Sequence, residues 1–446
     1  MPLPDALLDA LPRRSSTRLA VRVTPDAQRR IRAGHPWLYD GSIRSVNHKG
    51  EPGDLAVVFD DDRRFVAIGL WDPASPIRIK VLHQGKPVTI DAAWFQARIE
   101  AAAAIRQPLA ATAGTDHATT AYRVVHGEND GLPGLVVDRY GDVVVLKLYT
   151  AAWLPHLVDV VAGLEHVLSP RSIVLRLART LREQPLHGLC EGLVLSGTPV
   201  DGPVVFLEAG LEFEADVVHG QKTGHFLDQR DNRVRVGALA SGRRVLDVFS
   251  CTGGFSVHAA AGGAKVAHSI DASPGAIDTA RRNMARNASL VAVRACEHQT
   301  TVGEAFTEME RLVASRRRYD LVVVDPPSFA QNAASTGRAI ASYERLTTLA
   351  VALLERDGIL VQASCSSRVS APDFYRAVHT AASRAGADLE EIERTQHALD
   401  HPVTFPEGAY LKALFARPMH PHGRHAAAGV ARPDVAGPGP GSTRRG

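Results

Sequence analysis

Cysteines are few and far apart in this sequence. Four occur among its 446 residues, at positions 190, 251, 296 and 365, and none stands in a CxxC pair. This spacing argues against a disulfide framework and against the usual cysteine zinc sites, and it is typical of a reducing cytoplasm. The chain also lacks an apolar run of membrane-spanning length and an apolar segment near its N-terminus. We therefore expect a soluble, cytoplasmic protein that binds no metal and no membrane.

A strong charge of one sign is also missing. With 51 Lys and Arg against 48 Asp and Glu, the net charge is only +3, so the molecule as a whole is not built to coat a polyanion. Basic residues do cluster at 12–32 and at 171–182, and local patches of this kind suit phosphate backbones. Because a solvated face is the more common origin of such a patch, these clusters alone identify no partner.

The two ends of the chain have a different composition from residues 18–85. Residues 1–17 and 418–446 have little to bury and are predicted to be a flexible leader and a disordered tail. Residues 18–85 carry short apolar runs between Gly, Asp and Pro turns. That pattern predicts a small all-β barrel.

The rest of the chain changes pattern once more. Residues 86–205 mix helical and strand patterns and include a hairpin with Gly141-Asp142 at its turn, which predicts an α+β domain. Residues 206–417 alternate apolar strands with helices, which predicts an α/β fold with a doubly wound parallel sheet. The strands expected in this last segment cover 243–250, 264–271, 290–296, 319–327 and 358–365.

Two of the expected strand ends suit a cofactor, because ligands of such sheets bind at the carboxyl ends of the strands. The first strand runs into DVFSCTGGFS, where Gly253 and Gly254 allow the backbone to approach a ligand closely. The second ends in Asp271, whose carboxylate suits two ribose hydroxyls. The loop matches neither GxGxxG nor a GK[ST] phosphate loop, which favours an adenosine ligand without pyrophosphate. S-adenosylmethionine fits, although a Gly pair after a strand is also typical of a plain tight turn.

Two further strand ends carry reactive groups. Asp325 precedes Pro326 and Pro327, whose rings stiffen the turn so that it can present a planar base with the help of Phe329. Cys365 stands between serines at the polar exit of the neighbouring strand, whereas a buried cysteine ordinarily lies within the apolar run. We interpret Cys365 as a nucleophile and the other three cysteines as small buried hydrophobes.

Several longer motifs carry a resemblance to a known family. In chain order they are GHPWLYDGSI, YRVVHGENDGLPGLVVDRYGDVVVL, GQKTGHFLDQRDNR, VLDVFSCTGGFS, VVDPPSFA, SCSS and DHPVTFPEGAYLKAL. From about residue 18 to residue 417 the chain resembles the large-subunit ribosomal RNA cytosine-5 methyltransferase I family. The resemblance implies an RNA-binding PUA barrel at 18–85, a central EEHEE domain at 86–205, and a class I, Rossmann-like methyltransferase domain at 206–417.

The resemblance also implies a reaction and its participants. S-adenosylmethionine would be the cofactor, and large-subunit ribosomal RNA would be the partner. The resemblance also makes a homodimer one of the expected assemblies. Cys365 would add to carbon 6 of a flipped cytosine, while Asp325 hydrogen-bonds the ring as charge develops. Phe329 or Tyr343 would face the base. The chain departs from the family at Ser367, where glycine is usual, and at His225, where an aromatic is common.

The residues that the resemblance assigns fall into three groups. Those for the cofactor are Gln229, Asp247, Phe249, Ser250, Gly253, Gly254, Asp271, Glu304 and Asp325, with Glu297 left open as an alternative to Glu304 at the adenine. Those for the substrate are Arg230, Pro326, Pro327, Phe329 and Tyr343. Lys222 and Asp228 belong to the motif that leads into the methyltransferase core, where cofactor or site-closing roles are expected.

Two other functions stay open at the level of sequence. An Asp-Pro-Pro turn followed by an aromatic resembles the [DN]PP[YF] loop of enzymes that methylate an exocyclic base amine, here on guanine, and that chemistry does not need Cys365. A retired catalytic domain would leave an RNA-binding ribosome assembly factor that contacts phosphates through the barrel and the Arg clusters. A dispensable Cys365 would favour the first function, and absent cofactor binding would favour the second.

Overall fold

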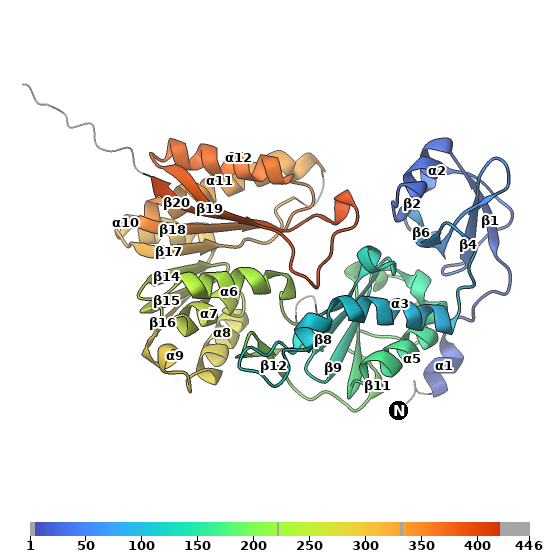
Figure 1. Ribbon diagram of the computed structural model, residues 1–446, viewed down its shortest axis with the longest axis horizontal. Coiled ribbons are helices and arrows are strands. Elements are labelled where there is room, and N and C mark those ends of the chain that lie inside the picture. The colour runs from blue at the N-terminus through green and yellow to red at the C-terminus, as the bar shows by residue number, and fades with distance from the viewer. Residues whose placement is uncertain (1–4, 221–222, 331–332, 420–446) are drawn as a thin grey trace, which may run out of the picture.

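The computed structural model describes residues 5–220, 223–330 and 333–419. Its strands form a six-stranded N-terminal sheet, a five-stranded central sheet, a two-stranded hairpin and a seven-stranded C-terminal sheet. Figure 1 shows these sheets in chain order, from blue through teal to orange. The predicted combination of an N-terminal β domain with a C-terminal Rossmann-like α/β domain is confirmed. Among the described residues no helix has the length and apolar character needed to span a membrane.

The N-terminal sheet has the strand order β2-β6-β5-β4-β1-β3. One pair, β1 with β4, is parallel, and the others are antiparallel. Alternate residues of β1 point inward, so that Leu19, Val21 and Val23 are fully buried. The strands are β1 (Leu19–Val23), β2 (Trp37–Tyr39), β3 (Ile43–Val46), β4 (Leu55–Phe59), β5 (Phe65–Trp71) and β6 (Ile77–Gln84).

The all-β prediction for this segment is wrong at α2 (Pro25–Arg32). The Thr24 hydroxyl accepts from the backbone N–H of Ala27 at 3.3 Å, and Pro25 occupies the first turn, where a missing N–H costs nothing. Ala27 and Ile31, one helical turn apart, bury themselves against the sheet. Thr24-Pro25 is therefore a recognisable helix start in the sequence. It was overlooked because strand-like segments flank it on both sides.

The leader also differs from the prediction. Residues 5–10 form the helix α1 (Asp5–Ala10) rather than an irregular segment. Leu7 and Leu11 are four residues apart, so both reach the same side, and both are buried in the core of the central sheet. Of the predicted tail, Pro418 and Met419 complete the last strand, and residues 420–446 lie outside the described residues.

The central sheet has the order β11-β10-β9-β8-β7. The predicted hairpin is confirmed, with Tyr140 opposite Val143 across the Gly141-Asp142 turn. One face packs against two helices through Phe95 and Leu164 among others, and the other face packs against the hairpin β12–β13. The elements are α3 (Ala92–Ile105), α4 (Gln107–Ala110), β7 (Ala121–His126), β8 (Leu135–Tyr140), β9 (Val143–Leu148), α5 (Leu157–Leu168), β10 (Ser172–Leu177), β11 (Val194–Gly197), β12 (Val204–Glu208) and β13 (Leu211–Ala215).

The C-terminal sheet has the order β16-β15-β14-β17-β18-β20-β19. Its first five strands are parallel, and β20 and β19 close the edge in antiparallel pairing. One face carries α10, α11 and α12, and the other carries α6 and α7 (Figure 1). The strands are β14 (Arg244–Val248), β15 (Val266–Asp271), β16 (Glu297–Val302), β17 (Tyr319–Val324), β18 (Leu354–Ser364), β19 (Asp388–Thr395) and β20 (Lys412–Met419). The helices are α6 (Arg230–Leu239), α7 (Gly254–Ala261), α8 (Pro274–Arg286), α9 (Val291–Ala295), α10 (Ala305–Ala314), α11 (Thr336–Leu353) and α12 (Ala371–Arg384).

The third predicted strand of this segment is wrong. The apolar run at 290–296 forms the short helix α9, in which Val291 is 71% exposed. The strand is the polar stretch that follows it, β16, whose first residue Glu297 pairs with Val266. Because β16 lies at the sheet edge and is only partly covered, its strand needs no continuous apolar sequence.

Candidate active site

A cavity of about 980 Å³ opens at the carboxyl ends of the parallel strands. It is not confined to the C-terminal domain, because Trp37 of the N-terminal sheet and Tyr149 of the central sheet also line it. Eleven of the residues expected from the sequence meet in this one cavity: Asp228, Gln229, Phe249, Ser250, Gly254, Asp271, Glu304, Asp325, Pro326, Pro327 and Cys365.

Cys365 follows β18 directly and is partly exposed to the cavity. The serines on both sides of it, Ser364 and Ser366, are buried. The Ser364 hydroxyl lies 2.8 Å from the Tyr343 hydroxyl, so the strand exit is fastened from the α11 side. The Cys365 thiol lies 3.7 Å from the carbonyl oxygen of Pro326, which brings the sulfur beside the proline turn. The end of β18 therefore places Ser364 and Ser366 in the core and directs Cys365 outward, toward the cavity.

Asp325 directly follows β17, the strand that pairs with β18 as predicted. Nε2 of Gln229 donates to Oδ1 of Asp325 at 2.8 Å, and Nδ2 of Asn232 donates to Oε1 of Gln229. Burial raises the pKa of Asp325 to about 7, with a further contribution from the nearby Asp228 carboxylate. A carboxyl group with this pKa can donate or accept a proton near neutral pH.

One carboxylate in the cavity lining, that of Asp271, is held in a fixed orientation. The oxygens of Asp271 accept backbone N–H groups from Cys251 and Ser273, both at 2.9 Å. Glu304 precedes α10, and its Oε2 accepts the Thr307 N–H at 3.0 Å as a helix cap. Glu297, by contrast, begins β16, at the end of the strand remote from the cavity. Of the two acidic candidates, only Glu304 lines the cavity.

The loop after β14 has an unusual backbone. Phe249, Cys251 and Gly253 have φ values of 62°, 48° and 76°, in the left-handed region that non-glycine residues rarely adopt. A Cβ on Gly253 would lie 2.7 Å from Cβ of Ala280 in α8. The glycine is therefore required by helix packing, and Gly253 itself does not line the cavity, contrary to its expected ligand contact.

Buried polar atoms without a partner support the fit of a polar ligand to this loop. Oγ of Ser250, which lines the cavity, has no hydrogen-bond partner among the described residues, and neither does Oδ1 of Asp247. The other Asp247 oxygen accepts from N and Oγ of Ser256 at 3.0 and 2.8 Å. Such buried groups ordinarily find partners. A ligand with amino and hydroxyl groups, such as S-adenosylmethionine, suits this donor and acceptor set.

Some expected residues lie away from the cavity. Tyr343 is fully buried in the apolar core. The Phe329 ring packs edge-on against it, with the two ring centroids 5.4 Å apart. Neither residue lines the cavity, so neither is placed to face a base. Arg230 is buried and donates to Asp400 at 3.0 Å instead of reaching a ligand. Asp247 supports the loop from behind. Lys222 lies outside the described residues.

No local sequence pattern predicts the wall of the cavity that belongs to the central sheet. Lys147 lines it from β9, and its ammonium lies 5.4 Å from the centroid of the Tyr149 ring, which is 49% exposed. His126, Val136 and Lys147 are neighbours across β7, β8 and β9. Only the strand pairing reveals this row, because its members are separated by many residues in the chain.

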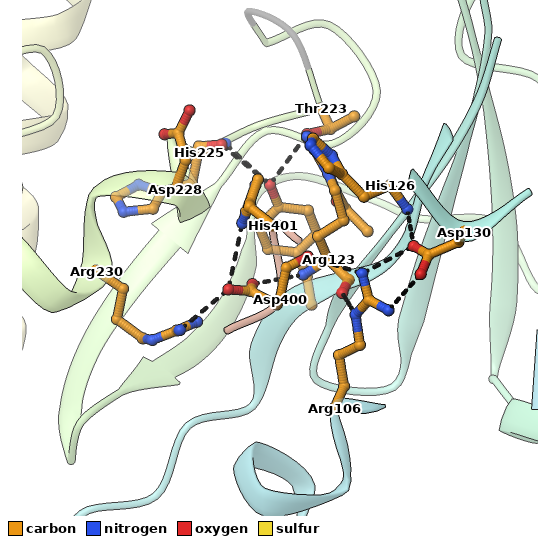
Figure 2. Close-up of polar contacts among 12 residues, drawn as sticks. Arg106, Arg123, His126, Asp130, Thr223, His225, Asp228, Arg230, Asp400 and His401 are labelled. Atoms are coloured by element: carbon orange, nitrogen blue, oxygen red, sulfur yellow. Dashed lines mark hydrogen bonds and ion pairs between the residues drawn. The ribbon is translucent and has the colours of Figure 1, made fainter. Parts of the chain in front are cut away.

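A buried polar network ties the central sheet to the C-terminal domain beside the cavity. Arg106 donates to both oxygens of Asp130 at 2.8 Å and to the backbone carbonyl of Asp400 at 2.9 Å. The Asp400 side chain accepts the Arg123 backbone N–H at 2.9 Å and receives Arg230 from the other side. Figure 2 shows Asp400 between these groups. The network holds the two walls of the cavity in a fixed relation.

The remaining cysteines divide into two groups. Burial raises the pKa of Cys251 and of Cys296 to about 11, so both thiols are protonated at neutral pH. Cys190 is exposed, which makes the expectation of a buried hydrophobe wrong at that position. It lies in the segment between β10 and β11, whose leucines Leu181 and Leu189 are buried in the core while Cys190 faces outward.

Comparison with known proteins gives this arrangement a class. A family model of S-adenosylmethionine-dependent methyltransferases matches residues 166–417, and a model of PUA-like domains matches residues 21–84. The crystal structure of SMU.776 complexed with SAH has the same fold, with a TM-score of 0.76 over 89% of this chain and 99% of that one, at 21% identity. The chain is thus an S-adenosylmethionine-dependent methyltransferase with an N-terminal PUA-like domain.

Close relatives narrow the class to a family. The ribosomal RNA large subunit methyltransferase of Deinococcus radiodurans is 47% identical over 91% of this chain and 98% of its own length. Ribosomal RNA large subunit methyltransferase I of Shewanella amazonensis is 35% identical over 90% of this chain and 99% of its own length. The chain belongs to this family of large-subunit ribosomal RNA methyltransferases I.

Proposed function

We propose that this enzyme methylates carbon 5 of a cytosine in large-subunit ribosomal RNA, with Cys365 as a covalent nucleophile. The names of its relatives support the RNA class. One observation carries the chemistry: the Cys365 thiol lies 3.7 Å from the Pro326 carbonyl, beside Asp325, in the cavity that Asp271 and Glu304 also line. A thiol and a titratable carboxyl on adjacent strand ends can address two positions of one pyrimidine ring.

The reaction needs both groups because carbon 5 of cytosine is a poor nucleophile. Addition of the Cys365 thiolate to carbon 6 converts the ring into an enamine with electron density at carbon 5. Asp325, partly protonated at neutral pH because burial raises its pKa to about 7, donates to the ring nitrogen as negative charge develops there. Bound S-adenosylmethionine supplies an electrophilic methyl group. Loss of the carbon-5 proton to water then restores the ring double bond and breaks the C–S bond, which returns the thiolate, while the ring nitrogen gives its proton back to Asp325.

The cofactor roles follow from the placement of the lining residues. Asp271, fixed by two backbone N–H groups, would hold the ribose hydroxyls. Glu304 would accept from the adenine amino group, and Ser250 with the loop backbone would hold the amino-acid part. Gln229 holds Asp325 in place through its hydrogen bond of 2.8 Å. This assignment leaves the cavity beyond Cys365 for the substrate.

The substrate part of the cavity suits a nucleotide. It is lined by Lys147, Tyr149 and Trp37, which combine a cation with aromatic faces. Aromatic side chains stack on bases that have left a helix, and lysine binds phosphate. The target cytosine would leave its stack to reach Cys365, and the PUA-like segment, proposed to cover residues 18–85, would add RNA contacts at a distance.

Nucleoside analysis tests the product. The purified protein is incubated with unmodified large-subunit ribosomal RNA and isotopically labelled S-adenosylmethionine, and the digested RNA is examined by mass spectrometry. Label in 5-methylcytidine is the expected result. Label in a methylguanosine would refute the proposal and move the chemistry to the Asp325 loop, with Cys365 in a structural role. Absence of both label and cofactor binding would favour an assembly factor without activity.

A trapping experiment tests the covalent step. In RNA that contains 5-fluorocytidine, the carbon-5 proton is replaced by fluorine, so the adduct cannot eliminate the thiolate. The wild-type protein should therefore give a denaturation-resistant RNA complex, and the variant Cys365→Ala should give none while it still binds S-adenosylmethionine. Cys190→Ala is the matched control, because Cys190 is an exposed thiol outside the cavity. An active Cys365→Ala variant would exclude the mechanism.

A further inference from the structure

The loop that follows Cys365 is fastened to a buried lysine. Lys412 begins β20 and lies opposite Ser364 in the antiparallel register with β18. It is only 3% exposed. Its ammonium donates to the backbone carbonyls of Ser366, of Val369 at 2.6 Å and of Tyr410 at 3.2 Å. All three donors of the ammonium are thus used on main-chain oxygens around the nucleophile.

The surroundings of this lysine differ from those of the other strongly buried lysine, Lys80. Lys80 pairs with the Asp72 carboxylate at 2.7 Å, as a buried charge ordinarily does. Lys412 takes part in none of the ion pairs found within the described residues, and its partners are neutral carbonyls. Burial lowers the pKa of Lys412 to about 8, and the charge of Cys365 acts in the opposite direction. The ammonium therefore persists at neutral pH beside a group that can become an anion.

Tyr343 and Tyr410, the other described groups on which the charge of Cys365 acts, supply no positive charge. Burial raises the pKa of Tyr343 on α11 to about 12 and raises that of Tyr410, in the loop before β20, well above its usual value. Both phenols are therefore neutral when the enzyme works. Asp325, at the end of β17, is neutral or negative, since burial raises its pKa to about 7. A thiolate at Cys365 would be disfavoured by these neighbours alone.

We propose that Lys412 is a positioning residue that holds the Cys365 loop and stabilises the thiolate form of the nucleophile. The proposal rests on the proposed role of Cys365. Tyr343 fastens the residue before the cysteine and Lys412 fastens the residue after it, so the sulfur has a fixed direction. The same positive charge favours thiolate before addition to the base and again when the C–S bond breaks.

Alkylation kinetics test the charge and the geometry separately. The rate at which iodoacetamide modifies Cys365 is followed against pH by mass spectrometry of the peptide that contains it, which excludes the exposed Cys190 from the signal. Lys412→Gln keeps two N–H donors without the charge, and Lys412→Arg keeps the charge. In Lys412→Gln the profile should move to higher pH and the rate at neutral pH should fall about tenfold. Lys412→Arg should stay close to the wild type.

Two results would overturn the proposal. A Lys412→Gln profile that coincides with the wild type would show that the charge does nothing to the thiol. A profile lowered by the same factor at every pH would show a change of access rather than of ionisation. If Lys412→Gln does not fold, the wild-type profile alone decides, because a Cys365 thiol that titrates at or above the ordinary cysteine value of about 8.5 contradicts a stabilised thiolate. None of these readouts depends on methylation, so failure of the proposed function would show separately, as an active Cys365→Ala variant.

Discussion

The Gln229 side chain donates a hydrogen bond of 2.8 Å to Oδ1 of Asp325. Gln229 stands just before α6, in the segment that leads into the methyltransferase fold, whereas Asp325 directly follows β17. The amide occupies one carboxyl oxygen and leaves the other for the substrate. Since a Gln amide N–H only donates, the bonded oxygen must be an acceptor, so any proton on Asp325 belongs on Oδ2. That orientation makes the titration of Asp325 a measurable part of catalysis.

We predict that activity falls as the pH rises through about 7. The pKa of Asp325 is raised to about 7 by burial, so the protonated, donating form is lost above that value. Asp325→Asn still accepts from Gln229 and still donates to the base, but it cannot transfer a proton. Its rate should fall by about a hundredfold and lose the decline above pH 7. The measurement is the single-turnover rate against pH.

The control for this prediction is Asp247→Asn, because burial raises the pKa of Asp247 to about 7 as well. Asp247 supports the loop after β14 and does not line the cavity. The decline above pH 7 should persist in this variant. If the decline above pH 7 is absent from Asp247→Asn and present in Asp325→Asn, the titrating group is Asp247.

Cofactor affinity should distinguish the two acidic residues near β16. Glu304→Gln removes a carboxylate from the cavity and keeps an oxygen for the cap of α10, so S-adenosylmethionine should bind about tenfold more weakly. Glu297→Gln changes an exposed residue at the opposite end of the strand and should leave the affinity unchanged. Isothermal titration calorimetry of the two variants gives both values. Equal effects would remove Glu304 from the adenine site.

RNA affinity should depend on the exposed ring of Tyr149. Loss of a stacking contact costs about 1 to 3 kcal/mol per base, so Tyr149→Ala should raise the Kd for RNA while cofactor affinity stays constant. Tyr149→Phe, which keeps the ring, should bind nearly as well as the wild type. An unchanged Kd in Tyr149→Ala would place the RNA elsewhere.

The free energy of unfolding should depend on the bidentate ion pair between Arg106 and Asp130. Arg106 is fully buried and also holds the Asp400 carbonyl (Figure 2), so Arg106→Met leaves a carboxylate without its partner. Breaking a buried pair in this way typically costs about 3 to 5 kcal/mol. Arg376→Met breaks the exposed pair with Asp373 at 2.9 Å and should cost less than about 1 kcal/mol. Urea denaturation followed by fluorescence compares the two, and similar midpoints would contradict a structural role for the network.

Particular elements show where the sequence was informative and where it was not. The hairpin around Gly141-Asp142 and the strands β14, β15, β17 and β18 were predictable, because turn residues and buried apolar runs are local signals. The run at 290–296 was misleading, since an apolar stretch of that length also suits a short helix at the surface. Tyr343 was misassigned for a related reason: an aromatic near a site is as useful to the core as to a ligand.

By itself, the sequence determined four of the parallel strands of the C-terminal domain, β14, β15, β17 and β18, and the reactive residues at their ends. Those signals are local, and parallel strands bring their carboxyl ends to one edge whatever the loops do. Tertiary structure alone decided which of these residues share a cavity, that Glu304 rather than Glu297 reaches it, and that Lys147 and Tyr149 form its other wall. It also decided that Lys412 holds the loop of Cys365. These relations depend on strand pairing and domain packing between distant segments, which leave no pattern in the neighbourhood of any one residue.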